Sequence, residues 1–230
     1  MKLSPARVNI GPMTTPRRSL LAVLAGLIAL PRLARAQTPP PDQILLPPPR
    51  TGPPPPRVKM TTDKGVIIVE VYPDRAPLTA GLFLRMVREN RYVKPAFYRC
   101  VKLMPPGGAP IGMVQGGETA PTDKALPPIA HESTNQTGLL HRNGAISMPR
   151  FERGTARGEF FICVGDLTSL DEQRPQEGVD TYGFAVFGKV VEGMDVVRAI
   201  HEIPPSLTAG QESMRGEILD PPLPVVLEAL

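Results

Sequence analysis

Few residues in this 230-residue sequence have the types and spacing that metal binding or acid–base catalysis requires. The three histidines, His131, His141 and His201, have no ligand-like spacing with cysteines or carboxylates. We therefore expect three surface histidines and no metal site. Glu132 and Glu159 do not form a convincing acid/base pair, because nothing in the sequence relates their positions.

One polar side chain in an apolar segment has a chemistry that needs no proton transfer. Arg99 follows Phe97-Tyr98, and a guanidinium has five N–H donors, no acceptor and a permanent charge. It could act by electrostatic preorganisation, but it could not act as an acid or a base. By itself, Arg99 is more simply a surface arginine on a strand. Asp171 and Glu172 are interpreted as solvated loop charges.

The elements that would position these residues begin at Val58. Apolar alternation on either side of 63–65 predicts two strands joined by a tight turn, and helical spacing predicts helices over 77–90 and 193–200. Six more short runs, rich in Val, Ile and Phe, predict further strands at 96–101, 111–115, 145–148, 160–164, 184–191 and 225–230. About eight strands and two helices favour a mainly β fold, a closed or nearly closed antiparallel barrel with a helix at each end. The polar stretch 118–143 is expected to be a surface loop region.

The two cysteines are predicted to remain free thiols. Strand alternation turns Cys100 into the barrel, opposite Arg99, whereas Cys163 shares the outer face with Phe161. Side chains on opposite faces of a barrel wall cannot reach disulfide geometry.

The N-terminal region has the features of a secretory leader. Arg17-Arg18 precede an apolar run over 20–30, and an Ala-x-Ala site ends at Ala36. Eleven residues are too few to cross a bilayer as a helix. We therefore predict a signal peptide over 1–36, cleaved after Ala36, an exported periplasmic protein and no stable membrane insertion. A retained anchor is the alternative, and the paired arginines leave both the general secretory and the twin-arginine routes open.

Proline and charge separate the remaining chain into two parts. Ten of the 30 prolines lie within 39–56, which predicts a semi-rigid polyproline II linker over 37–57. Residues 1–57 carry eight basic residues and one acidic residue, whereas 58–230 carry 18 basic and 21 acidic residues, a net −3. No basic stripe with aromatic residues remains after 57, so we expect no nucleic-acid partner. Residues 58–230 are enough for one folded domain.

Five blocks of this domain resemble consecutive blocks of a cyclophilin, in the same order. They are Phe97–Val101, Gly112–Gly117, Ile146–Arg150, Gly158–Cys163 and Phe184–Met194. The resemblance implies an eight-stranded antiparallel closed barrel capped by two α-helices, and peptidyl-prolyl cis–trans isomerase activity on proline-containing polypeptides without a cofactor. The sequence is most similar to the bacterial, exported branch, and we expect a monomer that assists the folding of exported proteins.

The resemblance also implies roles for individual residues. Arg99 matches the catalytic arginine, and Gln115 matches the glutamine that holds a peptide carbonyl beside the rotating bond. Met113 and Phe161 match the floor of the proline pocket. The remaining substrate-binding positions are Phe184, Arg150, Pro149, Glu159 and Tyr182.

Several of these positions differ from the best-known members of the family. Gly112 stands where the family usually has a pocket phenylalanine, just after an unusual insertion over 102–110. Losing that ring should reduce the apolar contact with proline, unless Met104 or Ile111 folds back to replace it. Pro149 has no N–H to offer a substrate, whereas Arg150 keeps its own. Glu159 replaces a glutamine and adds negative charge near Arg99. Phe184 keeps an aromatic wall without a polar tip, and Tyr182 is the aromatic residue nearest to a missing groove tryptophan. These losses support the alternative of a catalytically weak cyclophilin-fold peptide-binding module or chaperone. A third possibility, a structural envelope protein tethered through the proline-rich stretch, rests only on an uncleaved leader.

Overall fold

The computed structural model describes residues 53–118, 124 and 126–230. The predicted signal peptide, and the predicted linker up to residue 52, lie outside the described residues. The described chain enters its first strand at Arg57. No helix within the described ranges is both long and apolar enough to span a membrane.

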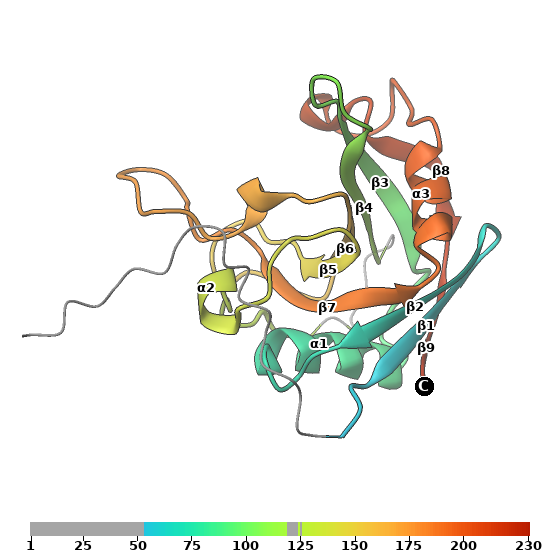
Figure 1. The fold of residues 1–230 in the computed structure, drawn as a ribbon. Helices are drawn as coiled ribbons and strands as arrows, with labels where there is room; N and C mark the ends of the chain where they lie inside the picture. Colours follow the sequence, from blue (N-terminus) through green and yellow to red (C-terminus); the bar gives the residue numbers. More distant parts are fainter. Residues whose placement is uncertain (1–52, 119–123, 125) are drawn as a thin grey trace, which may run out of the picture. The chain divides into compact units, whose positions relative to one another are not determined.

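The strands and helices follow one another along the chain in a mainly β pattern (Figure 1). They are β1 (Arg57–Thr62), β2 (Gly65–Val71), α1 (Pro77–Arg88), β3 (Ala96–Leu103), β4 (Ile111–Gly117), α2 (Thr134–Thr137), β5 (Ala145–Met148), β6 (Phe160–Val164), β7 (Ala185–Glu192), α3 (Met194–Glu202), β8 (Ile218–Pro224) and β9 (Val226–Ala229). Short 3₁₀ turns occur at Thr168–Leu170 and Glu212–Met214.

All strands join one antiparallel sheet in the order β8-β3-β4-β6-β5-β7-β2-β1-β9. The two edge strands are consecutive in the chain, and the turn between them is held where the N–H of Val225 donates to the carbonyl of Pro95 (3.0 Å). The sheet therefore curls into a nearly closed barrel. α1 packs against β7 and β9, and α3 packs against β2, β3, β4 and β6 (Figure 1). The predicted barrel with two main helices is confirmed.

The strand count differs from the prediction because β8 was missed. Within the described chain the sheet has nine strands instead of eight. β8 contains Pro221, Pro222 and Pro224, and proline cannot donate to a strand ladder. Its position at an edge, where β3 is the one strand of the described chain that pairs with it, tolerates this loss.

The barrel interior is filled by alternate side chains of the strands. On β6, Phe160 and Ile162 belong to the main core, whereas Phe161 and Cys163 belong to a smaller apolar cluster on the other face. Phe83 of α1 closes the core against Phe160, with ring centroids 5.7 Å apart. Both faces of β6 are thus buried, and the outer cluster forms one side of the cavity described next.

Candidate active site

A cavity of about 570 Å³ lies over the outer face of β3, β4 and β6. It is lined by nearly all the predicted site residues, namely Arg99, Gln115, Met113, Phe161, Phe184, Arg150, Pro149 and Glu159. Tyr182 is not among the described residues that line it; its ring lies under the guanidinium of Arg153, 4.2 Å from centroid to Cζ. Residues that the sequence did not point to also contribute, including Tyr98, Phe151, Leu170 and Met214.

A bulge in β3 turns two adjacent side chains toward this cavity. Phe97 pairs with Gly116 and Arg99 with Gln115, so Tyr98 is an extra residue without a partner in the β4 ladder. Strict alternation would put Tyr98 and Arg99 on opposite faces. Because of the bulge, both line the cavity.

Arg99 is held between two side chains at the cavity edge. Its Nη1 donates to Gln115 Oε1 (3.1 Å), while Nε and Nη2 donate to Glu217 Oε2 (2.9 and 2.7 Å). The predicted proximity of Arg99 and Gln115, beside an apolar hollow with Met113 and Phe161, is found. Glu217 was not anticipated, because it lies 118 positions away in sequence.

The amide of Gln115 is engaged by two neighbours. Its Nε2 donates to the hydroxyl of Tyr98 (2.7 Å), and Glu159 accepts hydrogen bonds from both Tyr98 and Gln115. Partial burial raises the pKa of Glu159, against the lowering effect of these hydrogen bonds and of Arg99. Burial and the carboxylate of Glu159 also raise the pKa of Tyr98. Glu159 therefore competes for the N–H groups that a substrate carbonyl would use.

The floor of the cavity is apolar and rigidly backed. Phe161 is fully buried, and its ring meets Phe184 edge-on at 5.7 Å and 89°. Its centroid also lies 5.8 Å from that of the His141 ring, at an interplanar angle of 10°. Met113 packs against the same cluster. An aromatic face and a flexible thioether are suited to a proline ring.

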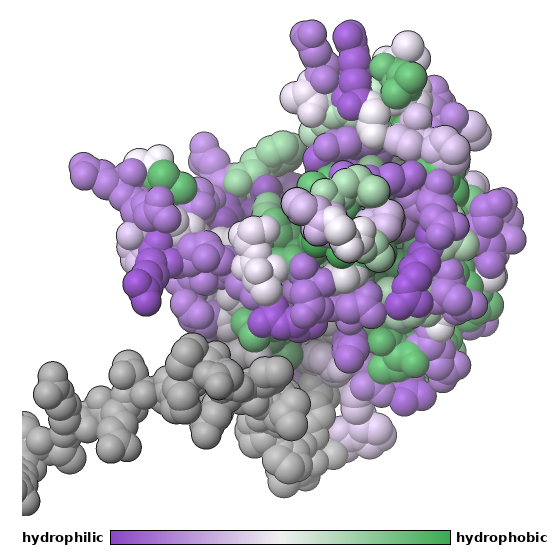
Figure 2. All heavy atoms as spheres, turned by 45° about the horizontal axis from the view of Figure 1, so that its top comes forward, coloured by the Kyte–Doolittle hydropathy of each residue, from purple (hydrophilic) through white to green (hydrophobic). Residues whose placement is uncertain are grey.

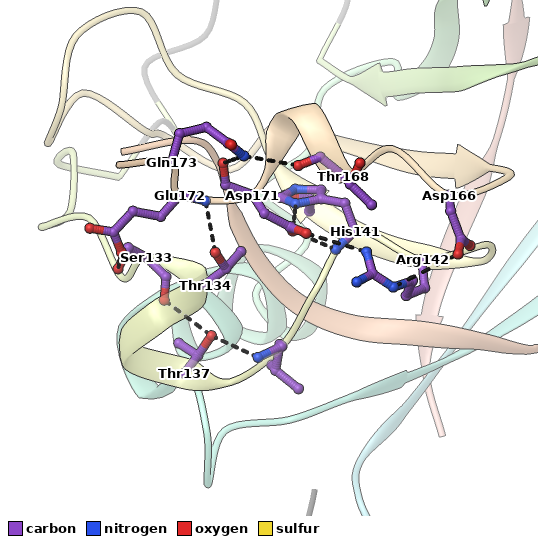
Figure 3. A network of polar contacts seen from close by, with 12 residues as sticks. Ser133, Thr134, Thr137, His141, Arg142, Asp166, Thr168, Asp171, Glu172 and Gln173 are labelled. Carbon is purple, nitrogen blue, oxygen red and sulfur yellow. Dashed lines mark hydrogen bonds and ion pairs between the residues drawn. The ribbon is translucent and has the colours of Figure 1, made fainter. Parts of the chain in front are cut away.

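Behind this floor lies a polar network centred on the buried residues His141 and Asp171 (Figure 3). Asp171 Oδ1 accepts from the backbone N–H of His141 (2.8 Å) and lies 2.7 Å from its Nδ1, while Nε2 lies 2.9 Å from Ser147 Oγ. Burial opposes ionisation of Asp171, but the two hydrogen bonds from His141 and the nearby charge of Arg142 together keep the pKa of Asp171 below its ordinary value. The expectation that His141 and Asp171 lie in solvent is wrong, as it is for the buried His201.

Arg150 anchors the cavity wall with all five of its N–H donors. They go to Asp180, to the carbonyl of Gly183 and to the carbonyl of Phe151. The side chain is only 4% exposed, and its guanidinium carbon lies 5.6 Å from the centroid of Phe184. The Arg150 hydrogen bond lowers the pKa of Asp180 to about 2. The Arg150 side chain therefore positions Phe184 and has no donor to spare for a substrate.

Neither Met104 nor Ile111 replaces the pocket phenylalanine that is missing at Gly112. Met104 is 72% exposed, and neither it nor Ile111 is among the described residues that line the cavity. Leu170 and Met214 supply apolar lining instead, and Phe151 stands at the rim with 90% of its surface exposed.

Both cysteines are buried and unpaired, as predicted. Cys100 belongs to the barrel core and Cys163 to the outer cluster. Burial raises the pKa of each thiol to about 12. Within the described ranges, no three His, Cys, Asp or Glu side chains come together as a metal site.

Comparisons with known proteins identify the family to which the chain belongs. The family model for cyclophilin type peptidyl-prolyl cis-trans isomerases matches residues 57–218. A peptidyl-prolyl cis-trans isomerase of Acinetobacter baylyi is 37% identical over 153 residues, which cover 65% of this chain and 73% of the relative. Peptidyl-prolyl cis-trans isomerase B of Escherichia coli is 30% identical over 177 residues, 75% of this chain and 97% of the relative.

A solved structure shares the fold. It is a cyclophilin type peptidyl-prolyl cis-trans isomerase of Cryptosporidium parvum, solved in the presence of the dipeptide Ala-Pro. The two structures align with a TM-score of 0.55 at 18% identity, over 76% of this chain and 98% of the other.

Proposed function

The chain belongs to the cyclophilin-type family of peptidyl-prolyl cis-trans isomerases, and on this premise we propose that it is an exported isomerase that acts on X–Pro bonds of unfolded or flexible polypeptides in the periplasm. Proline-containing substrates are supported by the related structure solved with Ala-Pro. The export assignment rests on the leader sequence, with its basic flank, short apolar run and Ala-x-Ala site.

The reaction requires binding and orientation, without proton transfer or covalent chemistry. Rotation about a peptide bond has a barrier of about 18–20 kcal/mol, because the C–N bond has partial double-bond character. The cis and trans forms of X–Pro are nearly balanced, yet they exchange over tens to hundreds of seconds. A catalyst must therefore bind the twisted amide more tightly than either planar form.

Arg99 is the proposed source of that differential binding. In the twisted amide the prolyl nitrogen regains a lone pair, and a fixed N–H donor stabilises this state selectively. The observation that carries the proposal is the Arg99–Gln115 hydrogen bond at the edge of a cavity whose floor is Phe161 and Met113. The proline ring would rest on that floor while Gln115 holds the neighbouring carbonyl.

A proline-limited refolding assay with an unfolded protein substrate tests this assignment. Removing a preorganised donor in other enzymes lowers turnover by about 10²–10³-fold, so Arg99→Ala should lose activity on that scale. Equal rates for Arg99→Ala and the wild type would remove Arg99 from the mechanism. Retained peptide affinity without turnover in the wild type would instead favour a binding module.

Export and oligomeric state have separate tests. N-terminal sequencing of secreted protein should begin at Gln37, whereas an intact leader would favour the tethered alternative. We expect a monomer; on the face shown in Figure 2, apolar side chains lie among polar ones. Sedimentation at micromolar concentration would check this expectation.

A further inference from the structure

The carboxylate of Glu217 binds one edge of the Arg99 guanidinium. Nε and Nη2 both donate to the same oxygen, Oε2, at 2.9 and 2.7 Å. The side chains of Arg99 and Glu217 are 23% and 28% exposed, so the pair is partly shielded from water. Glu217 is not among the described residues that line the cavity, whereas Arg99 is.

The backbone keeps Glu217 in place next to the strand that carries Arg99. The N–H of Cys100 donates to the carbonyl of Glu217 (2.7 Å), and the N–H of Glu217 donates to the carbonyl of Met214 (3.1 Å). Ile218, the next residue, begins β8 and pairs with Arg99 in the β3–β8 ladder. The carboxylate thus extends from a backbone that is tied to β3 one residue from the guanidinium.

The hydrogen bonds of Arg99 to Glu217 and Gln115 determine which of its N–H groups a substrate could use. Arginine has five N–H groups, and three of them have partners among the described residues: two at Glu217 and one at Gln115. One N–H on Nη1 and one on Nη2 remain. Since the guanidinium is planar, fixing Nε, Nη1 and Nη2 through these two neighbours also fixes the directions of the two remaining N–H groups.

We propose that Glu217 is a positioning residue for the isomerase reaction, which holds the Arg99 guanidinium so that its two remaining N–H groups keep a fixed direction at the cavity edge. This inference rests on the proposed role of Arg99. A free arginine side chain has many rotamers, and ordering them during the reaction would subtract from the stabilisation of the twisted amide. Glu217 orders the side chain before the substrate binds and does not itself touch the substrate.

The test separates turnover from binding in the full chain. The variants are Glu217→Ala, which removes the acceptor, and Glu217→Gln, which keeps its size and one acceptor oxygen. Exchange NMR with a saturating X–Pro peptide gives the cis–trans rate on the enzyme, and a titration gives the peptide Kd. We expect Glu217→Ala to lower the on-enzyme rate about tenfold, or about 1.4 kcal/mol, with Kd within about twofold and Glu217→Gln in between.

A matched control is available on the far side of the sheet. Glu70 accepts from Nε and Nη2 of Arg57 at a single oxygen, Oε1 (3.2 and 2.8 Å), in the same side-on geometry between β1 and β2. Glu70→Ala should change the unfolding midpoint about as much as Glu217→Ala while leaving the rate unchanged. The Arg99 Nε–H resonance should shift and broaden only in the Glu217 variants.

The outcomes distinguish this inference from the function on which it rests. If Arg99→Ala is inactive and Glu217→Ala turns over as fast as the wild type or faster, the positioning role is refuted and Arg99 remains catalytic. Should Glu217→Ala fail to fold, an on-enzyme rate of Glu217→Gln equal to that of the wild type would also refute the positioning role of Glu217. If the wild type itself does not accelerate exchange, or Arg99→Ala is fully active, the proposed function fails first.

Discussion

Replacing Glu159 by glutamine should make this enzyme bind its substrates more tightly. In the structure the carboxylate of Glu159 accepts from Tyr98 and Gln115, and the second hydrogen bond of the Gln115 amide goes to the Tyr98 hydroxyl. An amide NH₂ has only two donors. A substrate carbonyl that binds Gln115 must therefore displace one of the two existing bonds.

The size of the effect follows from the charge of the displaced acceptor. A hydrogen bond to a charged group contributes about 1.5–3 kcal/mol, and one between neutral groups about 0.5–1.5 kcal/mol. Glu159 keeps much of its surface exposed, although its carboxylate is partly desolvated, so solvent screening favours the lower part of the difference, about 1 kcal/mol. This corresponds to about a fivefold decrease in peptide Kd for Glu159→Gln, while the on-enzyme rate should stay within about twofold.

The pH dependence gives the same prediction a second readout. The pKa of Glu159 is raised, so as the pH falls through that pKa the wild type should lose its charge and approach the Kd of Glu159→Gln. The folded state then binds the proton more tightly than the unfolded state, so the stability of the wild type relative to Glu159→Gln should also rise as the pH falls.

The control for this prediction is Glu152→Gln, which removes the same charge from an exposed residue of the same loop. It should leave Kd unchanged, both at neutral pH and at low pH. A Glu159→Gln variant with unchanged or weaker peptide binding at neutral pH would refute the competition between Glu159 and the substrate.

Three further predictions concern stability and reactivity. Gly112→Ala should lower the denaturant midpoint strongly, because φ is +154° and the new Cβ would lie 1.8 Å from a backbone oxygen; Gly81→Ala, in open space within α1, should be neutral or stabilising. Asp180→Asn should cost at most about 1 kcal/mol near pH 7, since Asp180 is 50% exposed. The hydrogen bond from Arg150 lowers the pKa of Asp180 to about 2, so the difference in stability between the wild type and Asp180→Asn should vanish as the pH falls from above 3.8 to below 2. A difference in melting temperature that stays constant over this pH range would contradict the prediction. Both thiols should resist modification in the native protein, since burial raises their pKa to about 12. After unfolding without reductant, a thiol assay should count two free thiols, and a count of zero would mean that the two cysteines form a disulfide.

Much of the fold could be predicted from the sequence, because its strands have strong local patterns. On β6, Phe160 and Phe161 face opposite sides, as period-two alternation requires, and both find an apolar environment. β8 had no such pattern, since its prolines interrupt it. α2 was missed for another reason: four residues, Thr134–Thr137, are too short for helical periodicity to be detectable.

The candidate site was predictable wherever its residues lie in recognisable blocks, and not where a contact joins distant segments. Arg99 and Gln115 face each other across adjacent strands, and both belong to such blocks. Glu217 meets Arg99 from 118 positions away in a segment with no local signal. His141 was assigned to the surface because its partner Asp171 lies 30 positions ahead, and only the folded chain brings the two together.

The pH dependence of turnover should therefore report a neighbour of the catalytic groups and not the groups themselves. A guanidinium cannot be deprotonated in a protein, an amide does not titrate, and the reaction itself transfers no proton. The carboxylate of Glu159, which accepts from the Gln115 amide, has a raised pKa and loses its charge as the pH falls. Loss of that charge frees a donor of Gln115 for the substrate, whereas the hydrogen bond from Arg99 to Gln115 does not depend on it. A rise in peptide affinity as the pH falls through the pKa of Glu159, with an unchanged on-enzyme rate, would show that this carboxylate acts on binding and not on the rotation step.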